Sequence, residues 1–330
     1  MGCADSAIVA AWISNRLAPD ALAELEAHAD RCDACLHLLA AIGRVCADPR
    51  SREIHHTHGA PVLADWAVLA AAPGAAIGRY ELVGVLGRGG FGVVYEARDR
   101  ELGRDVAIKA LFAAADAVNA AAIRSEARAL AALNHPNVVR LYDVVETGAR
   151  VYLVMELVRG TTMRAWQRDR SDTEIVDGYL AAASGLSAIH DVGLVHADVK
   201  PDNLLVTHAD MRVLVTDFGL ARAVATAAGD VAGTPRYMAP EQRAGARVSA
   251  SADQYAWCVA LWEALHRALP SERALRPTSA RVRSVLRRGL APQPSDRWPS
   301  MHALALALRH ALRPSRRWWA LAAGLGLAGA

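Results

Sequence analysis

Four side chains within twenty residues have the types and spacing needed for chemistry on a phosphate group. The segment VHADVKPDNLL, residues 195–205, contains the carboxylate of Asp198, the ammonium group of Lys200 and the amide of Asn203. Asp217 follows an apolar run, VLVT. Asp198 is placed to accept a proton from a hydroxyl, and Lys200 to neutralise a transferring phosphate. Asn203 and Asp217 would hold Mg²⁺. Any one acid more often caps a turn, so the hypothesis depends on the conjunction.

A glycine-rich segment, LGRGGFGVVY, forms the second part of the pattern. Gly87, Gly89 and Gly92 are spaced as G-x-G-x-x-G, and strand-forming residues follow them rather than a helix. Such a strand–loop–strand lets backbone N–H groups fold over phosphates. Lys109 follows in VAIK. Glu126, in the later segment IRSEARAL, is expected to pair with Lys109 and hold it against the α- and β-phosphates. The alternative for Lys109 is a surface lysine whose stem packs on the sheet.

These residues must be positioned by a β-rich segment that precedes a helical one. Five short runs read as strands: YELVGVL, VVYEARD, DVAIKAL, VRLYDVV and RVYLVMEL. A helix is expected at 117–133, and longer apolar-periodic helices at 174–191 and 251–266. The predicted fold class is therefore α+β, with a small β-rich lobe and a larger helical lobe.

The motifs GRGGFGVV, VAIK, HADVKPDN, DFG and APE resemble those of bacterial serine/threonine protein kinases of the eukaryotic-like type, over residues 79–312. The resemblance implies a two-lobed fold with ATP in the cleft and phosphoryl transfer to protein Ser/Thr hydroxyls. It implies Asp198, Lys200, Lys109 and Glu126 as catalytic residues, and Asn203 and Asp217 as Mg²⁺ ligands. Nucleotide contacts would come from Leu86, Gly87, Arg88, Gly89, Gly90, Phe91, Gly92, Val94, Ala107, Lys109, Met155, Glu156, Leu157 and Leu205.

The resemblance also implies three supporting contacts and exposes two departures. The segment at 195–205 would be the catalytic loop, with Thr234 beside its residues Asp198 and Lys200. Asp253 would anchor this loop, and Arg297 would pair with Glu241. Ala197 stands where many relatives have an arginine that contacts an activation-loop phosphate. The segment between His266 and Ser279 is shorter than usual in the family, which concerns the substrate-docking helix.

The N-terminal residues contain a candidate metal site. His28, Cys32 and Cys35 form H-x₃-C-x₂-C, which brings three soft ligands together, whereas tetrahedral Zn²⁺ needs four. Cys3 is the best fourth ligand and Cys46 the second. The pattern resembles the zinc-binding anti-sigma factor domain, which implies a sigma factor or another regulatory protein as partner. The alternative is a helix with buried free cysteines and a solvated histidine.

Net charge and cysteine content limit the expected partners and the cellular compartment. A net charge of +3 over 330 residues, without a basic stripe interleaved with aromatic residues, gives no reason to expect a nucleic-acid partner. Five cysteines, four of them in the first fifty residues, do not resemble a secreted disulfide framework. A reducing, cytoplasmic compartment fits better.

The expected organisation is a zinc-finger-like module at 1–47, a linker at 48–78, a kinase domain at 79–312 and a tail at 313–330. In the tail, SRRWWALAAGLGLAGA places cationic and aromatic residues before an apolar run, as at the inner face of a membrane. That run is shorter than the ~20 residues of a span. It is therefore the first half of a span, a shallow anchor or a frayed terminus.

Two other functions remain open on the sequence alone. The first is a pseudokinase scaffold, which binds nucleotide or a partner without phosphoryl transfer. The presence of Lys109, Asp198, Asn203 and Asp217 argues against it. The second is a sigma-factor-binding regulator in which the kinase domain is accessory.

Overall fold

The computed structural model describes residues 24–25, 27–28, 32, 74–89, 92–111, 117–147, 150–218, 234–246, 248–270 and 278–313. The chain divides into two compact units. One comprises Met1–Arg124 and Leu141–Leu157, and the other Ser125–Arg140 and Val158–Ala330. The first contains a β-sheet and the second is mostly helical, which confirms the α+β fold class.

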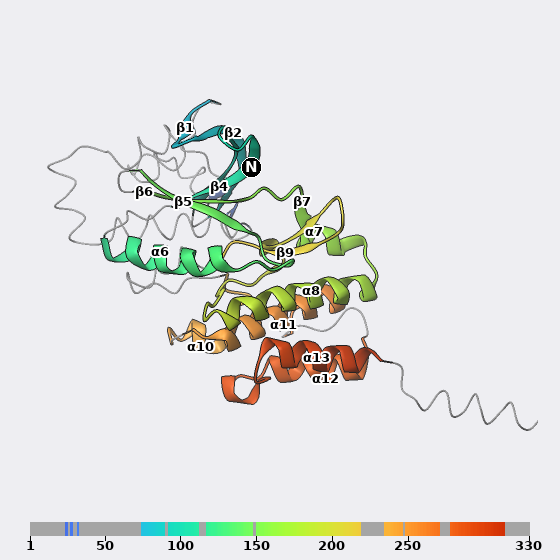
Figure 1. Ribbon diagram of the computed structural model, residues 1–330. Helices are drawn as coiled ribbons and strands as arrows, with labels where there is room; N and C mark the ends of the chain where they lie inside the picture. The colour runs from blue at the N-terminus through green and yellow to red at the C-terminus, as the bar shows by residue number, and fades with distance from the viewer. Residues whose placement is uncertain are drawn as a thin grey trace, which may run out of the picture. The chain divides into compact units, whose positions relative to one another are not determined.

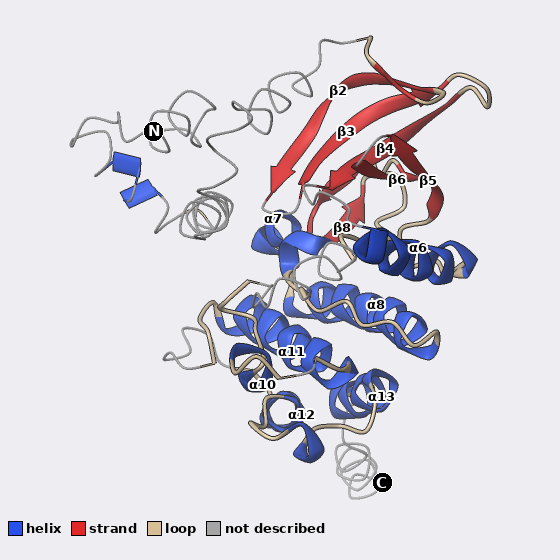
Figure 2. Cartoon of the chain, turned by 90° about the vertical axis from the view of Figure 1, so that its left-hand side faces the viewer, coloured by secondary structure: helices blue, strands red, loops and turns tan. Residues whose placement is uncertain are grey.

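The first unit is built on a six-stranded antiparallel sheet with the strand order β1-β2-β3-β4-β6-β5 (Figures 1 and 2). Its strands are β1 (Ala76–Ile77), β2 (Tyr80–Gly89), β3 (Gly92–Asp99), β4 (Arg104–Leu111), β5 (Leu141–Thr147) and β6 (Arg150–Glu156). The sequence pattern predicted five of these strands. The sixth, β1, is a two-residue edge strand that lies within the segment expected to be a linker.

The two faces of the sheet differ in character, and this difference sets the register. Tyr95, Ile108 and Val154 are direct cross-strand neighbours and are almost completely buried in one hydrophobic cluster. Lys109, one residue after Ile108, therefore projects from the opposite face. A slip of one residue would exchange the faces and place the lysine in the cluster, so the apolar pattern strongly disfavours it.

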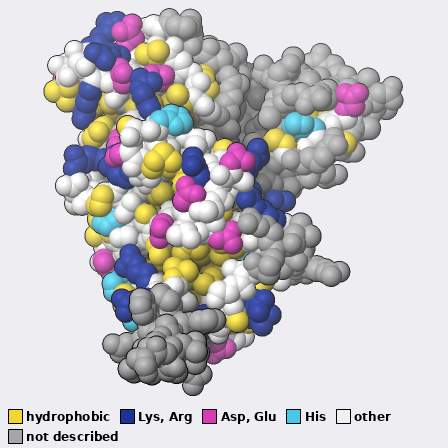
Figure 3. Space-filling view, turned by 90° about the vertical axis from the view of Figure 1, so that its right-hand side faces the viewer, with side chains coloured by type: hydrophobic (Ala, Val, Ile, Leu, Met, Phe, Trp, Pro, Cys, Tyr) yellow, Lys and Arg dark blue, Asp and Glu magenta, His cyan; other side chains and the backbone are white. Residues whose placement is uncertain are grey.

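Charged side chains on the first unit pair locally across neighbouring strands and turns. Arg98 contacts Asp105 at 2.6 Å, and Arg100 contacts Glu81 at 2.8 Å. Figure 3 shows basic and acidic side chains interspersed on one face of the molecule. Exposed pairs of this kind contribute little stability, typically about 0–1 kcal/mol each.

The second unit contains a small antiparallel sheet, β7 (Gly160–Thr162), β8 (Leu204–Thr207) and β9 (Val213–Val215), together with packed helices. The helices are α7 (Met163–Trp166), α8 (Asp172–Asp191), α10 (Pro240–Arg243), α11 (Ala250–His266), α12 (Ala280–Gly289) and α13 (Met301–Leu312). Short 3₁₀ turns lie at Gln167–Asp169, Pro201–Asn203 and Pro294–Asp296. The helix α6 (Ala117–Ala132) contains the division between the two units.

Local sequence explains why α8 begins where it does. The Ser171 hydroxyl accepts a hydrogen bond from the Glu174 amide, and the Glu174 carboxylate accepts one from the Ser171 amide. This reciprocal capping satisfies two N–H groups that the helix cannot satisfy itself. The helix then buries one apolar face against α11, where the Trp257 ring meets Tyr179 edge-on at 5.9 Å.

Helix α11 is apolar around most of its circumference, because other parts of the second unit surround it. Its buried residues include Trp257, Cys258, Leu261 and Leu265. The indole N–H of Trp257 donates to the carbonyl of Tyr179 at 3.0 Å, so the only polar group of that ring is satisfied. A helix that is apolar on most sides is packed on most sides. Its packing therefore holds the side chains at its ends, such as Asp253, in fixed positions.

Candidate active site

The β8–β9 hairpin brings the catalytic-loop amide and the second acid to the same end of the small sheet. Asn203 directly precedes β8, and Asp217 lies two residues after β9. Leu204 pairs with Val215, and the Thr216 amide donates to the Asn203 carbonyl at 3.0 Å. Two sequence-predicted metal ligands are therefore positioned by one antiparallel ladder, whose buried apolar residues fix its register.

Asp198 is the centre of a dense hydrogen-bond network. Its Oδ2 contacts the ammonium group of Lys200 at 2.9 Å and accepts a bond from Asn203 Nδ2 at 3.1 Å. Its Oδ1 accepts bonds from both the amide and the hydroxyl of Thr234, each at 2.9 Å. These four donor contacts fix the orientation of the carboxylate.

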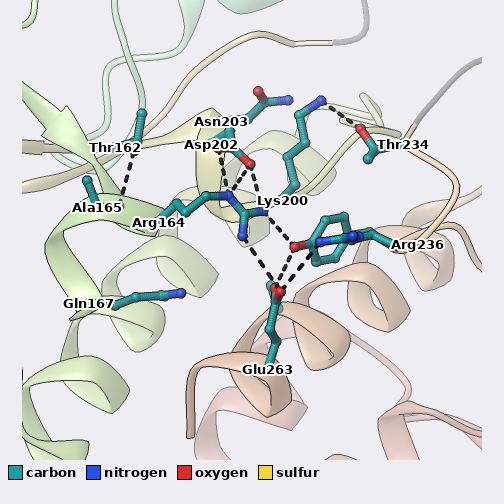
Figure 4. Close-up of polar contacts among 12 residues, drawn as sticks. Thr162, Arg164, Ala165, Gln167, Lys200, Asp202, Asn203, Thr234, Arg236 and Glu263 are labelled. Atoms are coloured by element: carbon teal, nitrogen blue, oxygen red, sulfur yellow. Dashed lines mark hydrogen bonds and ion pairs between the residues drawn. The ribbon is translucent and has the colours of Figure 1, made fainter. Parts of the chain in front are cut away.

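Thr234 links the same two catalytic-loop residues, as expected. Its hydroxyl donates to Asp198 at 2.9 Å. The same hydroxyl accepts a 2.6 Å hydrogen bond from Lys200 Nζ, which Figure 4 shows as a dashed line. A hydroxyl in this position can give its proton to the carboxylate while the ammonium group lies beside the oxygen. The arrangement is the one that a hydroxyl nucleophile needs.

Asp253, at the start of α11, anchors the catalytic loop from the interior, as expected. Its fully buried carboxylate accepts bonds from the amides of His196 at 2.8 Å and Ala197 at 2.6 Å. The same carboxylate contacts His190 Nε2 at 2.8 Å. A buried carboxylate with three donors is satisfied, and it ties the loop to the most buried helix of the unit.

The His196 ring fixes the next peptide of the loop. Its Nε2 lies 2.8 Å from the Thr216 carbonyl, and its Nδ1 accepts the Asp198 amide at 3.3 Å. A carbonyl can only accept, so Nε2 carries the proton and Nδ1 is the acceptor. The ring thereby connects the catalytic loop to the segment that leads to Asp217.

Two residues of the site have left-handed backbone conformations. The φ angles are +65° at Ala197 and +58° at Asp217. For a residue with a Cβ atom this conformation costs roughly 1–2 kcal/mol. The surrounding hydrogen bonds must therefore hold Ala197 in place, and such strain is typical of functional segments.

Glu241 and Arg297 form the expected ion pair in the interior of the second unit. The guanidinium donates to both carboxylate oxygens at 2.7 Å. Burial alone would raise the pKa of Glu241, but the hydrogen bonds and charge of Arg297 outweigh it, so the pKa is lowered. The pair fixes α10 against the segment that precedes α13.

A second polar cluster, which the sequence reading missed, adjoins the catalytic loop (Figure 4). Arg164 donates to both oxygens of Asp202, at 2.8 and 2.9 Å, and to the Tyr237 hydroxyl at 2.7 Å. Tyr237 in turn donates to Glu263. Burial opposes the charge of Arg164, but the bonds with Asp202 and Tyr237 raise its pKa. The four residues come from separate segments of the chain, so no spacing pattern in the sequence predicts that they form a cluster.

In the first unit, the structure brings the strand residues predicted to contact nucleotide onto one face. Lys109 in β4 lies opposite Val94 in β3, and Ala107 lies opposite Met155 in β6. Directly paired residues share a face, and residues two apart on a strand do as well. Lys109 is 7% exposed. Its predicted partner Glu126 belongs to the other unit, and that ion pair stays a prediction.

The glycine-rich segment connects β2 and β3. A Cβ atom at Gly92 would lie 2.1 Å from the Ala110 carbonyl oxygen, so only glycine fits there. Leu86 and Gly87 lie in β2, as do Arg88 and Gly89 by backbone. Glu156 ends β6, Leu157 follows it, and Leu205 lies in β8 of the second unit. Gly90 and Phe91 fall outside the described residues.

The predicted zinc ligands fall largely outside the described part of the chain. Cys3, Cys35 and Cys46 are not described, whereas His28 and Cys32 are. Within the described ranges, His, Cys, Asp and Glu side chains form no group of three that could hold a metal. The tail beyond Arg313 is likewise not described, and none of the helices that are described has the length and apolarity of a membrane span.

Comparison with known proteins agrees with this geometry. The family model for the protein kinase domain matches residues 80–308. The serine/threonine-protein kinase Pkn1 of Myxococcus xanthus is 35% identical over 299 residues, which cover 81% of this chain and 43% of that protein. PknD of Mycobacterium tuberculosis is 34% identical over 274 residues, which cover 74% and 41%. The chain thus spans less than half the length of these curated relatives.

The solved structures include a similar domain. The crystal structure of the Mycobacterium tuberculosis PknI kinase domain has a TM-score of 0.63 and 30% sequence identity, and the match covers 73% of this chain and 100% of that one. On the family match, the relatives Pkn1 and PknD and this structural likeness, the chain belongs to the protein kinase family, in its bacterial serine/threonine branch.

Proposed function

We propose that this protein is an ATP-dependent kinase that phosphorylates serine or threonine hydroxyls of other proteins. The observation that carries the proposal is the position of the Thr234 hydroxyl, between the Asp198 carboxylate and the Lys200 ammonium group. A substrate hydroxyl that takes this position can transfer its proton to Asp198. Lys200, beside the same oxygen, stabilises negative charge as the oxygen attacks phosphorus.

The protein kinase family implies ATP with Mg²⁺, and the residues present fit this pair. Asn203 Nδ2 donates hydrogen bonds to the carbonyl oxygen and to Oδ2 of Asp198, so Oδ1 of the same amide points away from these two acceptors. That oxygen and the Asp217 carboxylate are the hard ligands that Mg²⁺ prefers. Bound Mg²⁺ would neutralise charge on the phosphates. Lys109, on the sheet face with Val94 and Ala107, would bind the nucleotide, with Glu126 orienting the lysine.

A transfer assay distinguishes an active kinase from a pseudokinase scaffold. The assay uses radiolabelled ATP, the full chain and a generic Ser/Thr protein substrate, with Mg²⁺ or Mn²⁺. Asp198→Asn keeps the shape of the side chain but removes the base, and transfer should fall by roughly 10²–10⁴-fold. Asp210→Asn, an exposed acid in the β8–β9 turn, is the matched control and should transfer at the wild-type rate. Absence of transfer by the wild-type protein would favour the scaffold.

The N-terminal residues are proposed to form a zinc module at 1–47, joined to the kinase domain at 79–312 by the linker at 48–78. Support comes from His28, whose Nε2 is buried and makes no hydrogen bond within the described residues. A ring nitrogen in that state suits a metal bond. Cys32, Cys35 and Cys3 would complete the tetrahedron. Full-length protein purified under reducing conditions should contain one zinc per chain, and Cys35→Ser should lose it.

The partner of this module is proposed to be a regulatory protein, with a sigma factor as the specific candidate. The support is the resemblance of H-x₃-C-x₂-C to zinc-binding anti-sigma domains. A pull-down with the full chain and purified sigma factors, with Cys35→Ser as control, tests it. Capture of a sigma factor by the wild-type protein but not by Cys35→Ser would support a sigma-factor-binding role for the module.

The tail at 313–330 is proposed to place the protein at the inner face of the cell membrane. Arg316, Arg317, Trp318 and Trp319 precede an apolar run, and this order suits an anionic membrane surface. Full-length protein should sediment with anionic liposomes, whereas a chain that ends at Pro314 should not. Equal behaviour of the two proteins would remove the anchor.

A further inference from the structure

Three hydrogen bonds hold the backbone around Ala197, and one of them comes from a residue that no sequence motif singled out. The Ala197 amide donates to Asp253, and the Asp198 amide donates to His196. The third contact comes from Gln242, whose side-chain Nε2 donates to the Ala197 carbonyl at 2.9 Å. Gln242 lies in α10 and is 4% exposed.

The contact bears directly on the orientation of Asp198. The Ala197 carbonyl and the Asp198 amide belong to the same peptide group. Gln242 binds the first and His196 binds the second, so that both ends of this planar unit are fixed. Rotation of the peptide would redirect the Asp198 side chain, which leaves the adjoining Cα atom.

The conformation of Ala197 makes such rotation favourable unless something opposes it. With φ at +65°, its Cβ crowds the backbone, and a return to negative φ would relieve the crowding. That return would carry the carbonyl away from Gln242 and cost a buried hydrogen bond. The bond therefore opposes relaxation at the residue that precedes the catalytic acid.

Gln242 is itself firmly placed. The preceding residue, Glu241, is bound at both oxygens by the buried guanidinium of Arg297. The helix α10 starts at Pro240, whose ring presets the first helical φ. The amide of Gln242 thus connects a rigid, interior ion pair to the catalytic loop.

We propose that Gln242 is a positioning residue that holds Asp198 in its catalytic orientation. The inference depends on the proposed kinase activity and deepens it. Because the clamp is a neutral hydrogen bond to the backbone, it works with alanine at position 197 and needs no charge at that position. The catalytic loop is then ordered by Gln242 rather than by an arginine–phosphate contact.

The test measures kcat, KM for ATP and nucleotide affinity in the full-length protein. Gln242→Met keeps the volume but removes the donor, and kcat should fall by about 10- to 100-fold. KM for ATP and nucleotide affinity should stay at the wild-type values, since no nucleotide contact is proposed for Gln242. Gln167→Met is the matched control, because Gln167 is another buried glutamine, which accepts the Tyr179 hydroxyl. That control should lower stability without the loss in kcat.

A second variant separates positioning from packing. Ala197→Gly removes the Cβ crowding, so the loop has less tendency to relax. Gln242→Met should therefore reduce kcat by a smaller factor in the Ala197→Gly protein than in the wild type. Equal factors in the two backgrounds, or an unchanged kcat in folded Gln242→Met, would overturn the inference. Absence of transfer by the wild-type protein would instead contradict the proposed function.

Discussion

Arg297 donates two parallel hydrogen bonds of 2.7 Å to Glu241, 56 residues earlier in the chain. The guanidinium also donates to the carbonyls of Ala291 and Ser251, and its side chain has no exposed surface. Replacing Arg297 with Met leaves the partly buried Glu241 carboxylate and several carbonyls in the interior without their donor. We expect a loss of about 3–5 kcal/mol in the free energy of unfolding, measured with urea.

The matched control for this prediction is Arg124→Met. Arg124 pairs with Glu146 at 2.9 Å, and both side chains are about two-fifths exposed. Its loss should cost at most about 1 kcal/mol. The double variant Glu241→Met with Arg297→Met should lose less than Arg297→Met alone, because no charge is left buried. Equal losses in the Arg297 and Arg124 variants would contradict the prediction.

Stability should depend on pH through Glu241. Its pKa is lowered in the folded protein, so the folded state binds the proton less readily than the unfolded state. The resulting stabilisation is present above the unfolded value, about 4.3, and is lost as the pH falls through the folded value. The gap in free energy of unfolding between wild type and Glu241→Gln should narrow from pH 7 to pH 3.5. A constant gap would argue against a lowered pKa.

Gly289 and Cys258 are in close contact between α12 and α11. A Cβ atom at Gly289 would lie 2.3 Å from the Cys258 sulfur and 3.2 Å from a Leu304 methyl group. Gly289→Ala should therefore destabilise the protein by about 1–3 kcal/mol in a urea titration. Adding Cys258→Ala should recover part of the loss. Gly84→Ala, where no atom lies within 4 Å, is the control and should show a much smaller effect.

Activity should not require phosphorylation of the activation loop. Between Asp217 and Glu241 the Ser/Thr hydroxyls are Thr226, which lies outside the described residues, and Thr234, which contacts Asp198. Thr226→Ala should keep most of the activity, and phosphatase treatment should change little. Ala197→Arg should weaken the unphosphorylated enzyme, because the new charge has no anionic partner. Loss of transfer in Thr226→Ala would show that regulation by phosphorylation persists.

The local pattern of the chain was enough to predict the main elements. Short runs of strand-forming residues predicted β3 and β4, and the apolar-periodic run at 174–191 predicted α8. These features depend on residues that are close in sequence, so the periodicities of strand and helix can be recognised from the sequence alone. The motif residues, including Asp253 and the pair Glu241–Arg297, were also accessible, because a resemblance supplied the long-range pairing.

Only the tertiary structure decided the contacts that orient the site. Gln242 reaches Ala197 across 45 residues, and Arg164 reaches Tyr237 across 73. The sequence alone does not show whether a glutamine side chain is buried or solvated. It also does not show that an alanine has a positive φ, because alanine rarely adopts one. Hydrogen bonds are short and directional, so which donor meets which acceptor is settled only when the packing of α10 and α11 brings the backbone within about 3 Å.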